Sequence, residues 1–173
     1  MAILPIIIAP DRRLKVISQP VAQVDDEIRR LMDDILETMY AAPGIGLAAI
    51  QVGVAKQIIV IDLANGEDRE RDPHYFVNPK TLWTSEETAP QREGCLSVPD
   101  FYDEIDRPIK VVVDYLDYDG TKQERELDGT LSTCLQHEMD HLKGILFIDH
   151  LSRLKRSIIL KKLRKAQKLK QTA

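Results

Sequence analysis

The chain has 173 residues, of which 43% are hydrophobic and 30% charged, and its formal net charge is −4. This length is typical of one domain, and the apolar content suffices for a core without disulfide support. With only two cysteines, Cys95 and Cys134, a disulfide framework is excluded, and the small net charge argues against a nucleic-acid or membrane partner.

The chain starts with an apolar stretch, MAILPIIIAP, which has no basic residues before it and is interrupted by Pro5 and Pro10. A membrane span needs about 20 apolar residues, and a signal peptide begins with a basic region, so the stretch fits neither. We therefore expect no membrane association and a reducing, cytoplasmic setting.

A helix is expected from a cap at Asp25 to about Ala41, because its apolar residues recur at spacings of three and four on one face. This helix is predicted to serve core packing. The following segment 42–46, Ala-Pro-Gly-Ile-Gly, ends it, since proline cannot continue a helix and glycine allows unusual backbone angles.

The middle of the chain contains the predicted strands. A β-branched run at 58–61 predicts a buried strand, whereas the charged stretch 64–73, with an Asn-Gly pair at 65–66, predicts an exposed loop. A hairpin is predicted over 111–127, with its turn at 118–120.

Two further helices are expected near the C-terminus. The first covers 130–143, with Gly144 just after its end, and the second runs from a cap at Ser152 to about Lys170. Strands in the middle and helices on both sides favour an α+β fold over an alternating α/β fold.

Residues 137–141, His-Glu-Met-Asp-His, lie within the helix at 130–143. Histidines four residues apart share one helix face, so His137 and His141 can bind the same metal ion, and Glu138 can reach a water beside it. The alternative is a surface helix with two incidental histidines, but Leu135 and Leu142 mark this helix as packed. The motif therefore predicts a metal site.

A catalytic metal needs a third protein ligand and an open position for water. Position 147 is Phe147 rather than a third histidine, and no glutamate follows Glu138, so two common solutions are absent. Cys134 lies on the same helix and seven residues from His141, a rise of ~10 Å, and we expect it to be a packing residue. Cys95 is the better cysteine. The candidates that remain beside it are Asp149, His150 and His74.

Three segments resemble the signature motifs of the peptide deformylase family, in that family's order. They are Gly44-Ile45-Gly46-Leu47-Ala48-Ala49-Ile50-Gln51, Glu93-Gly94-Cys95-Leu96-Ser97 and the His137–His141 motif. The similarity extends from about Leu4 into the C-terminal helix. It implies small antiparallel or mixed sheets around a central helix that carries the two histidines, with a C-terminal helix. It also implies a hydrolase that removes the formyl group from formyl-methionine of nascent polypeptides and releases formate.

The resemblance further implies the ligands of the metal. Cys95, His137 and His141 would hold one divalent ion, with water in the fourth position, and Glu138 would be the general acid and base. The family's usual ion is Fe(II), with zinc, nickel or cobalt as substitutes, and this ligand set is compatible with all four.

The remaining roles concern the substrate. The resemblance assigns the amide of Gln51 and the backbone N–H of Leu96 to the developing oxyanion. It also implies that Gly44, Ile45 and Gly46 pair with the substrate backbone like an added strand. Methionine would need an unbranched apolar pocket, for which we predict walls from Ile45, Cys134, Leu135 and the ring of His137, with Thr133 as a polar edge.

Other positions concern the surroundings of the site. Glu93 and Arg107 are predicted to form an ion pair that steadies the cysteine segment. Pro43 stands where many family members have glutamate, and Asp100 stands where glycine is frequent. We expect these two differences to affect the rim and the side-chain preference but not the reaction.

The charge of the chain is divided unevenly. Residues 151–173 contain nine Lys or Arg and no Asp or Glu, which leaves 15 basic and 28 acidic residues, a formal −13, for residues 1–150. We expect a catalytic domain over 1–150 and a basic helix over 151–173 packed on it. Such a helix favours a ribosomal RNA partner, in agreement with a nascent-chain substrate and a bacterial cytoplasm rather than an organelle. The sequence predicts no particular oligomeric state.

Two other functions share some of these features. A zinc peptidase that cleaves ordinary peptide bonds carries the same histidine motif, and it would differ in its third ligand. An RNA-binding module with a structural metal would close its site with a fourth protein ligand.

Overall fold

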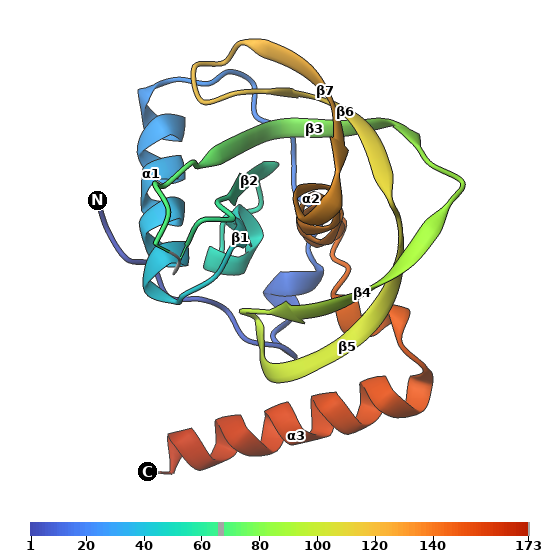
Figure 1. The fold of residues 1–173 in the computed structure, drawn as a ribbon. Coiled ribbons are helices and arrows are strands. Elements are labelled where there is room, and N and C mark those ends of the chain that lie inside the picture. Colours follow the sequence, from blue (N-terminus) through green and yellow to red (C-terminus); the bar gives the residue numbers. More distant parts are fainter. Residues whose placement is uncertain (66–67, 173) are drawn as a thin grey trace.

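The computed structural model describes residues 1–65 and 68–172. In this part of the chain, seven strands form two antiparallel sheets on either side of a central helix (Figure 1). The five-stranded sheet has the order β1 (Gly46–Ala48), β2 (Ile58–Ile61), β3 (His74–Thr84), β6 (Lys110–Leu116) and β7 (Lys122–Asp128). The other sheet is a hairpin of β4 (Thr88–Cys95) and β5 (Val98–Pro108). This arrangement confirms the predicted α+β class.

The helices occupy three different layers. Helix α2 (Gly129–Leu142) runs between the two sheets, α1 (Asp26–Ala41) lies beside β1 and β2, and α3 (Arg153–Gln171) runs along the outside of the β4–β5 hairpin (Figure 1). Short 3-10 helices connect these elements, namely η1 (Arg12–Lys15), η2 (Ala49–Val52) and η3 (Phe147–His150). No helix within 1–65 and 68–172 is long and apolar enough to cross a membrane.

Strand β2 is buried on both faces, which explains its continuous apolar sequence. Ile58 and Val60 pack in a core cluster with α1, whereas Ile59 and Ile61 pack in a second cluster with α2. Because successive side chains of a strand point to opposite faces, one short strand joins the two helices into one core.

The predicted helices have the expected ends. The Asp25 carboxylate accepts a hydrogen bond from the Ile28 N–H at 3.0 Å and so caps α1, and Ser152 caps α3 in the same way. Helix α2 ends just before Gly144, whose φ of +73° belongs to the left-handed region that glycine tolerates. A Cβ at Gly144 would lie 2.5 Å from the Lys15 carbonyl oxygen, so the close approach also requires glycine.

Strands β3, β4 and β5 were not predicted from the sequence. The predicted hairpin is present as β6 and β7, and Cys95 is the last residue of β4. Of the predicted loop 64–73, Asn65 is half-buried and 68–72 are exposed, while positions 66 and 67 lie outside the described residues.

Asp100, at the start of β5, has a φ of +70°. This conformation strains most side chains and is tolerated best by glycine, with Asn and Asp next. The aspartate at position 100 therefore suits a backbone conformation that glycine would also adopt.

Asp149 connects three parts of the chain that are distant in sequence. Its carboxylate accepts hydrogen bonds from Lys15 at 2.5 Å and Arg156 at 2.7 Å, which links η3 to η1 and α3. Burial raises the pKa of Asp149, but the hydrogen bonds from Lys15, the Leu146 N–H and Arg156 outweigh this effect, and the net shift is downward. The charged form is thus favoured in the folded state.

We expect Asp149→Asn to lower the free energy of unfolding by about 1 kcal/mol near pH 7, because two half-exposed cations lose their partner. A group with a lowered folded-state pKa stabilises the fold above its unfolded pKa, about 3.9 for Asp, and loses this effect as the pH falls through the lower folded value. The difference between the urea midpoints of the two proteins should therefore be constant at roughly pH 5–7 and shrink below about pH 4. Glu86→Gln, which removes an exposed carboxylate, is the control; a difference that persists unchanged at about pH 2 would contradict the role of the charge.

Candidate metal centre and active site

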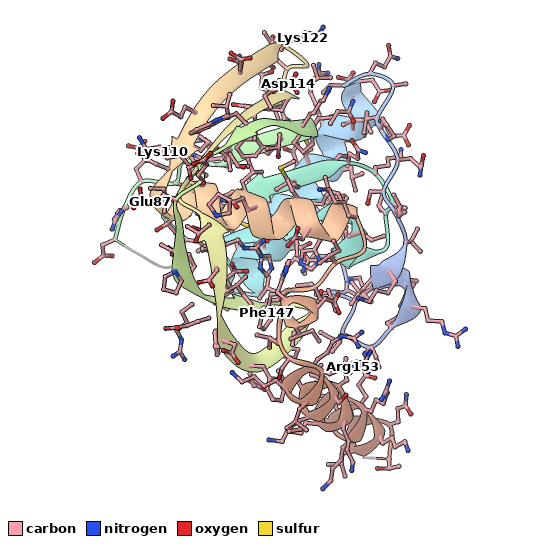
Figure 2. The ribbon with its side chains drawn as sticks, turned by 90° about the vertical axis from the view of Figure 1, so that its right-hand side faces the viewer. Glu87, Lys110, Asp114, Lys122, Phe147 and Arg153 are labelled. Carbon is pink, nitrogen blue, oxygen red and sulfur yellow. The ribbon has the colours of Figure 1, made fainter. Side chains whose placement is uncertain are left out.

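Helix α2 presents both histidines of its motif on one buried face. His137 and His141 lie one turn apart, are 7% and 0% exposed, and have ring centroids 5.1 Å apart. The His137 ring also stacks on Phe147, at a centroid distance of 6.2 Å. Phe147 lies between α2 and α3 (Figure 2). Packing therefore fixes the orientation of the histidine rings before any ion binds.

Cys95 lies at the end of β4, across from this face of α2. Its Sγ is 3.3 Å from His141 Nε2, and one ligand atom from each of Cys95, His137 and His141 lies within 4.8 Å of the others. In a tetrahedral site with bonds of about 2.0–2.3 Å, ligand atoms are about 3.3–3.7 Å apart. A thiolate and two imidazoles at this spacing fit a divalent transition metal. Within the described residues, this is the one group of His, Cys, Asp or Glu that comes together in this way.

The other candidates for a third ligand have different contacts. Asp149 is held by Lys15 and Arg156, His150 Nε2 contacts Asp140 at 2.8 Å, and His74 Nε2 contacts Asp72 at 3.3 Å. Cys134 faces the cavity beside α2, where burial raises the pKa of its thiol well above the usual value. Of the candidates for a third ligand, Cys95 is therefore the one that lies with both histidines in the described part of the chain.

A buried ion pair, Glu93–Arg107, contacts the Nδ1 side of the His137 ring. Glu93 accepts from His137 Nδ1 at 2.8 Å and from Arg107 at 2.7 and 2.8 Å through both of its oxygens. Because a carboxylate only accepts, Nδ1 of His137 carries the proton, which leaves Nε2 free to bind a metal. The predicted ion pair between Glu93 and Arg107 is therefore present.

The sequence did not reveal that this network extends further. Arg107 also donates to Asp140 at 2.8 Å, and Asp140 contacts His150 of η3. The only hint of this extension in the sequence was that Asp140 lies within the histidine motif, one residue before His141. Burial opposes ionisation of Glu93, but the hydrogen bonds from Arg107 and His137 lower the pKa of Glu93 to about 2. The carboxylate is charged at any physiological pH.

Glu138 points into the centre from the same turn of α2. It is 4% exposed, and its Oε2 has no hydrogen-bond partner among the described residues. Burial is the main cause that raises the pKa of Glu138 to about 7, and the charges of Glu93 and Asp140 add to it. A carboxyl group with such a pKa can both accept and donate a proton near neutrality.

Gly46 of β1 lies directly against this carboxylate. A Cβ at Gly46 would be 2.8 Å from Glu138 Oε1 and 2.8 Å from Cys134 Sγ, and one at Gly44 would be 2.6 Å from the Leu96 side chain. The absence of a side chain at Gly46 thus lets the backbone approach Glu138 and Cys134 closely, and at Gly44 it leaves room for the Leu96 side chain.

The two predicted oxyanion donors lie next to Cys95. Leu96 and Ser97 form the tight turn between β4 and β5, and Leu96 lines the cavity. Gln51 is buried, and its Nε2 donates to Ser97 Oγ at 3.0 Å and to Cys95 Sγ at 3.6 Å. Its amide is thus held within reach of the centre, with both N–H groups engaged.

A cavity of about 1070 Å³ opens in front of these groups. It is lined by residues 44–46, by the end of β4, and by His137 and Glu138 of α2. Of the predicted walls of a methionine pocket, Ile45, Thr133, Cys134 and His137 line it. Leu135 does not: it is fully buried and packs in the core with β2 and β6, because it lies on the other face of α2.

Comparison with known proteins agrees with this geometry. The family model described as polypeptide deformylase matches residues 3–157. A peptide deformylase of Phenylobacterium zucineum is 60% identical over 168 residues, which cover 97% of this chain and 99% of that protein. A second one, of Rhizorhabdus wittichii, is 57% identical over 177 residues and the full length of both chains.

Solved structures give the same result. The crystal structure of peptide deformylase from Ehrlichia chaffeensis has a TM-score of 0.91 and 42% identity, and it covers 98% of this chain and 99% of that one. One from Legionella pneumophila has a TM-score of 0.90 and 41% identity, with 99% of both chains covered. By sequence and by structure, this chain belongs to the polypeptide deformylase family, a family of metal-dependent hydrolases.

Proposed function

We propose that Cys95, His137 and His141 hold the metal ion of this deformylase and that Fe(II) is its native ion, with zinc, nickel or cobalt able to replace it. A bound divalent ion supplies Lewis acidity, which makes water more acidic and polarises a carbonyl group. The observation that carries the proposal is the convergence of the three ligand atoms within 4.8 Å beside the buried Glu138.

The reaction is hydrolysis of the formamide on the N-terminal methionine. Glu138 accepts a proton from the attacking water as the new C–O bond forms, and it delivers that proton to the amine nitrogen as the C–N bond breaks. Formate and a free amino terminus result. The pKa of Glu138, about 7, and the burial of its side chain support both the uptake and the delivery of the proton.

The tetrahedral state carries negative charge on the former carbonyl oxygen. Gln51 and the backbone N–H of Leu96 are proposed to donate to this oxygen, and losing one such donor typically costs ~10²–10³-fold in rate. For Gln51, one of its present hydrogen bonds, to Ser97 or to Cys95, is exchanged for one to the oxyanion.

The peptide is proposed to lie along Gly44, Ile45 and Gly46. Strand β1 is an edge strand, paired with β2 on one side, and its other side faces the cavity. An extended peptide can therefore pair with this segment as an added strand. The methionine side chain would enter between Ile45, Thr133 and Cys134.

Two observations favour this function over the alternatives. A zinc peptidase with the same histidine motif does not explain the agreement with deformylases along nearly the whole chain. A structural metal site has four protein ligands, whereas three converge within the described residues, and Glu138 lies beside them.

The basic helix α3 is proposed to bring the enzyme to its substrate. Ile159 and Leu163 bury one face of α3 on residues 1–150, the proposed catalytic domain, and most of its lysines and arginines are exposed. Dense positive charge with no acidic residue in the same segment is complementary to RNA phosphates. We infer a ribosomal RNA partner, where formylated nascent chains emerge, and hence a bacterial cytoplasmic location.

We expect the metal-loaded protein, prepared without oxygen, to release formate from formyl-Met-Ala-Ser. Glu138→Ala should keep the metal but lose at least ~10²-fold in kcat, because no other group moves the proton. Formate release and metal content are measured on the same samples. Cleavage of unformylated peptides by the wild type would support a peptidase, and an unimpaired metal-loaded variant would exclude the role of Glu138.

Cys95→Ser should bind the metal more weakly, because a neutral hydroxyl is a poorer ligand than a thiolate. Titration with Co(II), whose absorption reports thiolate ligation, measures the effect directly. Cys134→Ser is the matched control and should keep the wild-type spectrum and affinity. Equal affinity and spectra of Cys95→Ser and the wild type would remove Cys95 from the ligand set.

Deletion of 151–173 also removes core contacts, so charge substitution is the sharper test of α3. Replacing the exposed Lys161, Lys165 and Lys168 by glutamate should weaken co-sedimentation with ribosomes, while formate release from a free tripeptide remains. The wild-type interaction should fall steeply with salt concentration, as binding to phosphates does. Unchanged co-sedimentation of the variant would contradict an RNA contact through α3.

A further inference from the structure

The segment that follows β2 contacts the proposed peptide-binding segment through two hydrogen bonds. The backbone N–H of Asp62 donates to the Ile45 carbonyl at 2.9 Å, and the side-chain amide of Asn65 donates to the Gly44 carbonyl at 2.6 Å. Next to the Gly46–Ile61 pair of the sheet, these bonds continue the contact to residues 44 and 45, which precede the start of β1. The bond to Gly44 is donated by the side chain of Asn65 rather than by a backbone N–H.

This segment is itself anchored on the end of α1. Asp62 is fully buried, and its carboxylate accepts from the Tyr40 hydroxyl at 2.5 Å and from the backbone N–H groups of Ala64 and Asp72 at 2.9 and 3.1 Å. The Arg71 guanidinium covers the Tyr40 ring at 4.0 Å. In Figure 1, the chain after β2 accordingly runs beside the C-terminal end of α1. The contacts of Asp62 therefore hold in place the segment from which Asn65 donates to Gly44.

The peptide-binding segment needs such an external support. Gly44 and Gly46 have no side chains that could pack, and both are pressed against side chains on the cavity side, of Leu96 and Glu138. Glycine also has the greatest backbone freedom of all residues. Apart from Asn65, the described residues hold Gly44 by one backbone bond, from its N–H to the Met39 carbonyl at 2.9 Å.

We propose that Asn65 is a positioning residue for the peptide substrate. Its amide fixes the Gly44 carbonyl and thereby holds the free edge of 44–46 where an extended peptide can pair with it. This inference rests on the proposed pairing of the substrate with 44–46. It assigns a role to the loop 62–65, and it implies that Asn65 acts on the residues that follow the methionine rather than on the reacting formyl group.

The test compares two substrates that differ in length. Formyl-Met-Ala-Ser has backbone groups beyond the methionine that can pair with 44–46, whereas formyl-Met-amide has few. For Asn65→Ala, we expect kcat/KM for the tripeptide to fall about three- to tenfold, mainly through KM, as expected for one lost hydrogen bond. For formyl-Met-amide it should fall less than about twofold. Asn65→Asp, which keeps the shape but replaces the donor by an acceptor, should show at least the same selective loss.

The controls separate positioning from general damage. Gln23→Ala removes an exposed amide that has no side-chain hydrogen bond among the described residues, and it should match the wild type on both substrates. Metal content and thermal midpoint are measured for every variant. Equal losses on both substrates, or no loss on either, would overturn the positioning role. Failure of the wild type to release formate from either substrate would instead refute the proposed function.

Discussion

The buried ion pair between Glu93 and Arg107 is the contact on which the arrangement of the site depends. Glu93 comes from β4, Arg107 from β5, and their further partners His137 and Asp140 come from α2. Four charged or polar groups thus join the hairpin to the helix that carries the histidines. Removal of one partner from such a buried pair typically costs about 3–5 kcal/mol, because the other charge stays in a medium that cannot solvate it. The same contact that orients His137 therefore holds the hairpin in place.

This use of charge explains which elements could be predicted from the sequence. The helices were predicted with their caps, since Asp25 and Ser152 satisfy free N–H groups locally. Strand β2 was predicted because it is apolar on both faces. Strands β4 and β5 were not, because inward-facing positions such as Glu93 and Arg107 are charged and the pattern of alternating apolar residues is absent. That Glu93 and Arg107 are buried becomes evident only in the folded chain, where they pair with each other.

The site shows the same division between local and distant information. The two histidines on one helix face were evident from their spacing, because both lie within one turn of each other. Spacing alone left the candidate for a third ligand open, and the choice of Cys95 needed the family resemblance, since Cys95 meets His141 only through the packing of the hairpin on α2. Leu135 was misplaced by one helix face for a related reason: adjacency in sequence to Cys134 does not give a shared direction on a helix.

The distance in sequence between Cys95 and the histidines has a consequence for folding. His137 and His141 follow Cys95 in the sequence by 42 and 46 positions. Their side chains and that of Cys95 therefore meet only after most of the tertiary structure has formed. An ion held by the three residues binds the native chain and hardly the unfolded one, and by mass action it shifts the folding equilibrium in the same direction as a covalent cross-link. A metal in the proposed site would then be a structural component of the enzyme as well as its reagent, and chelation would remove stability together with activity.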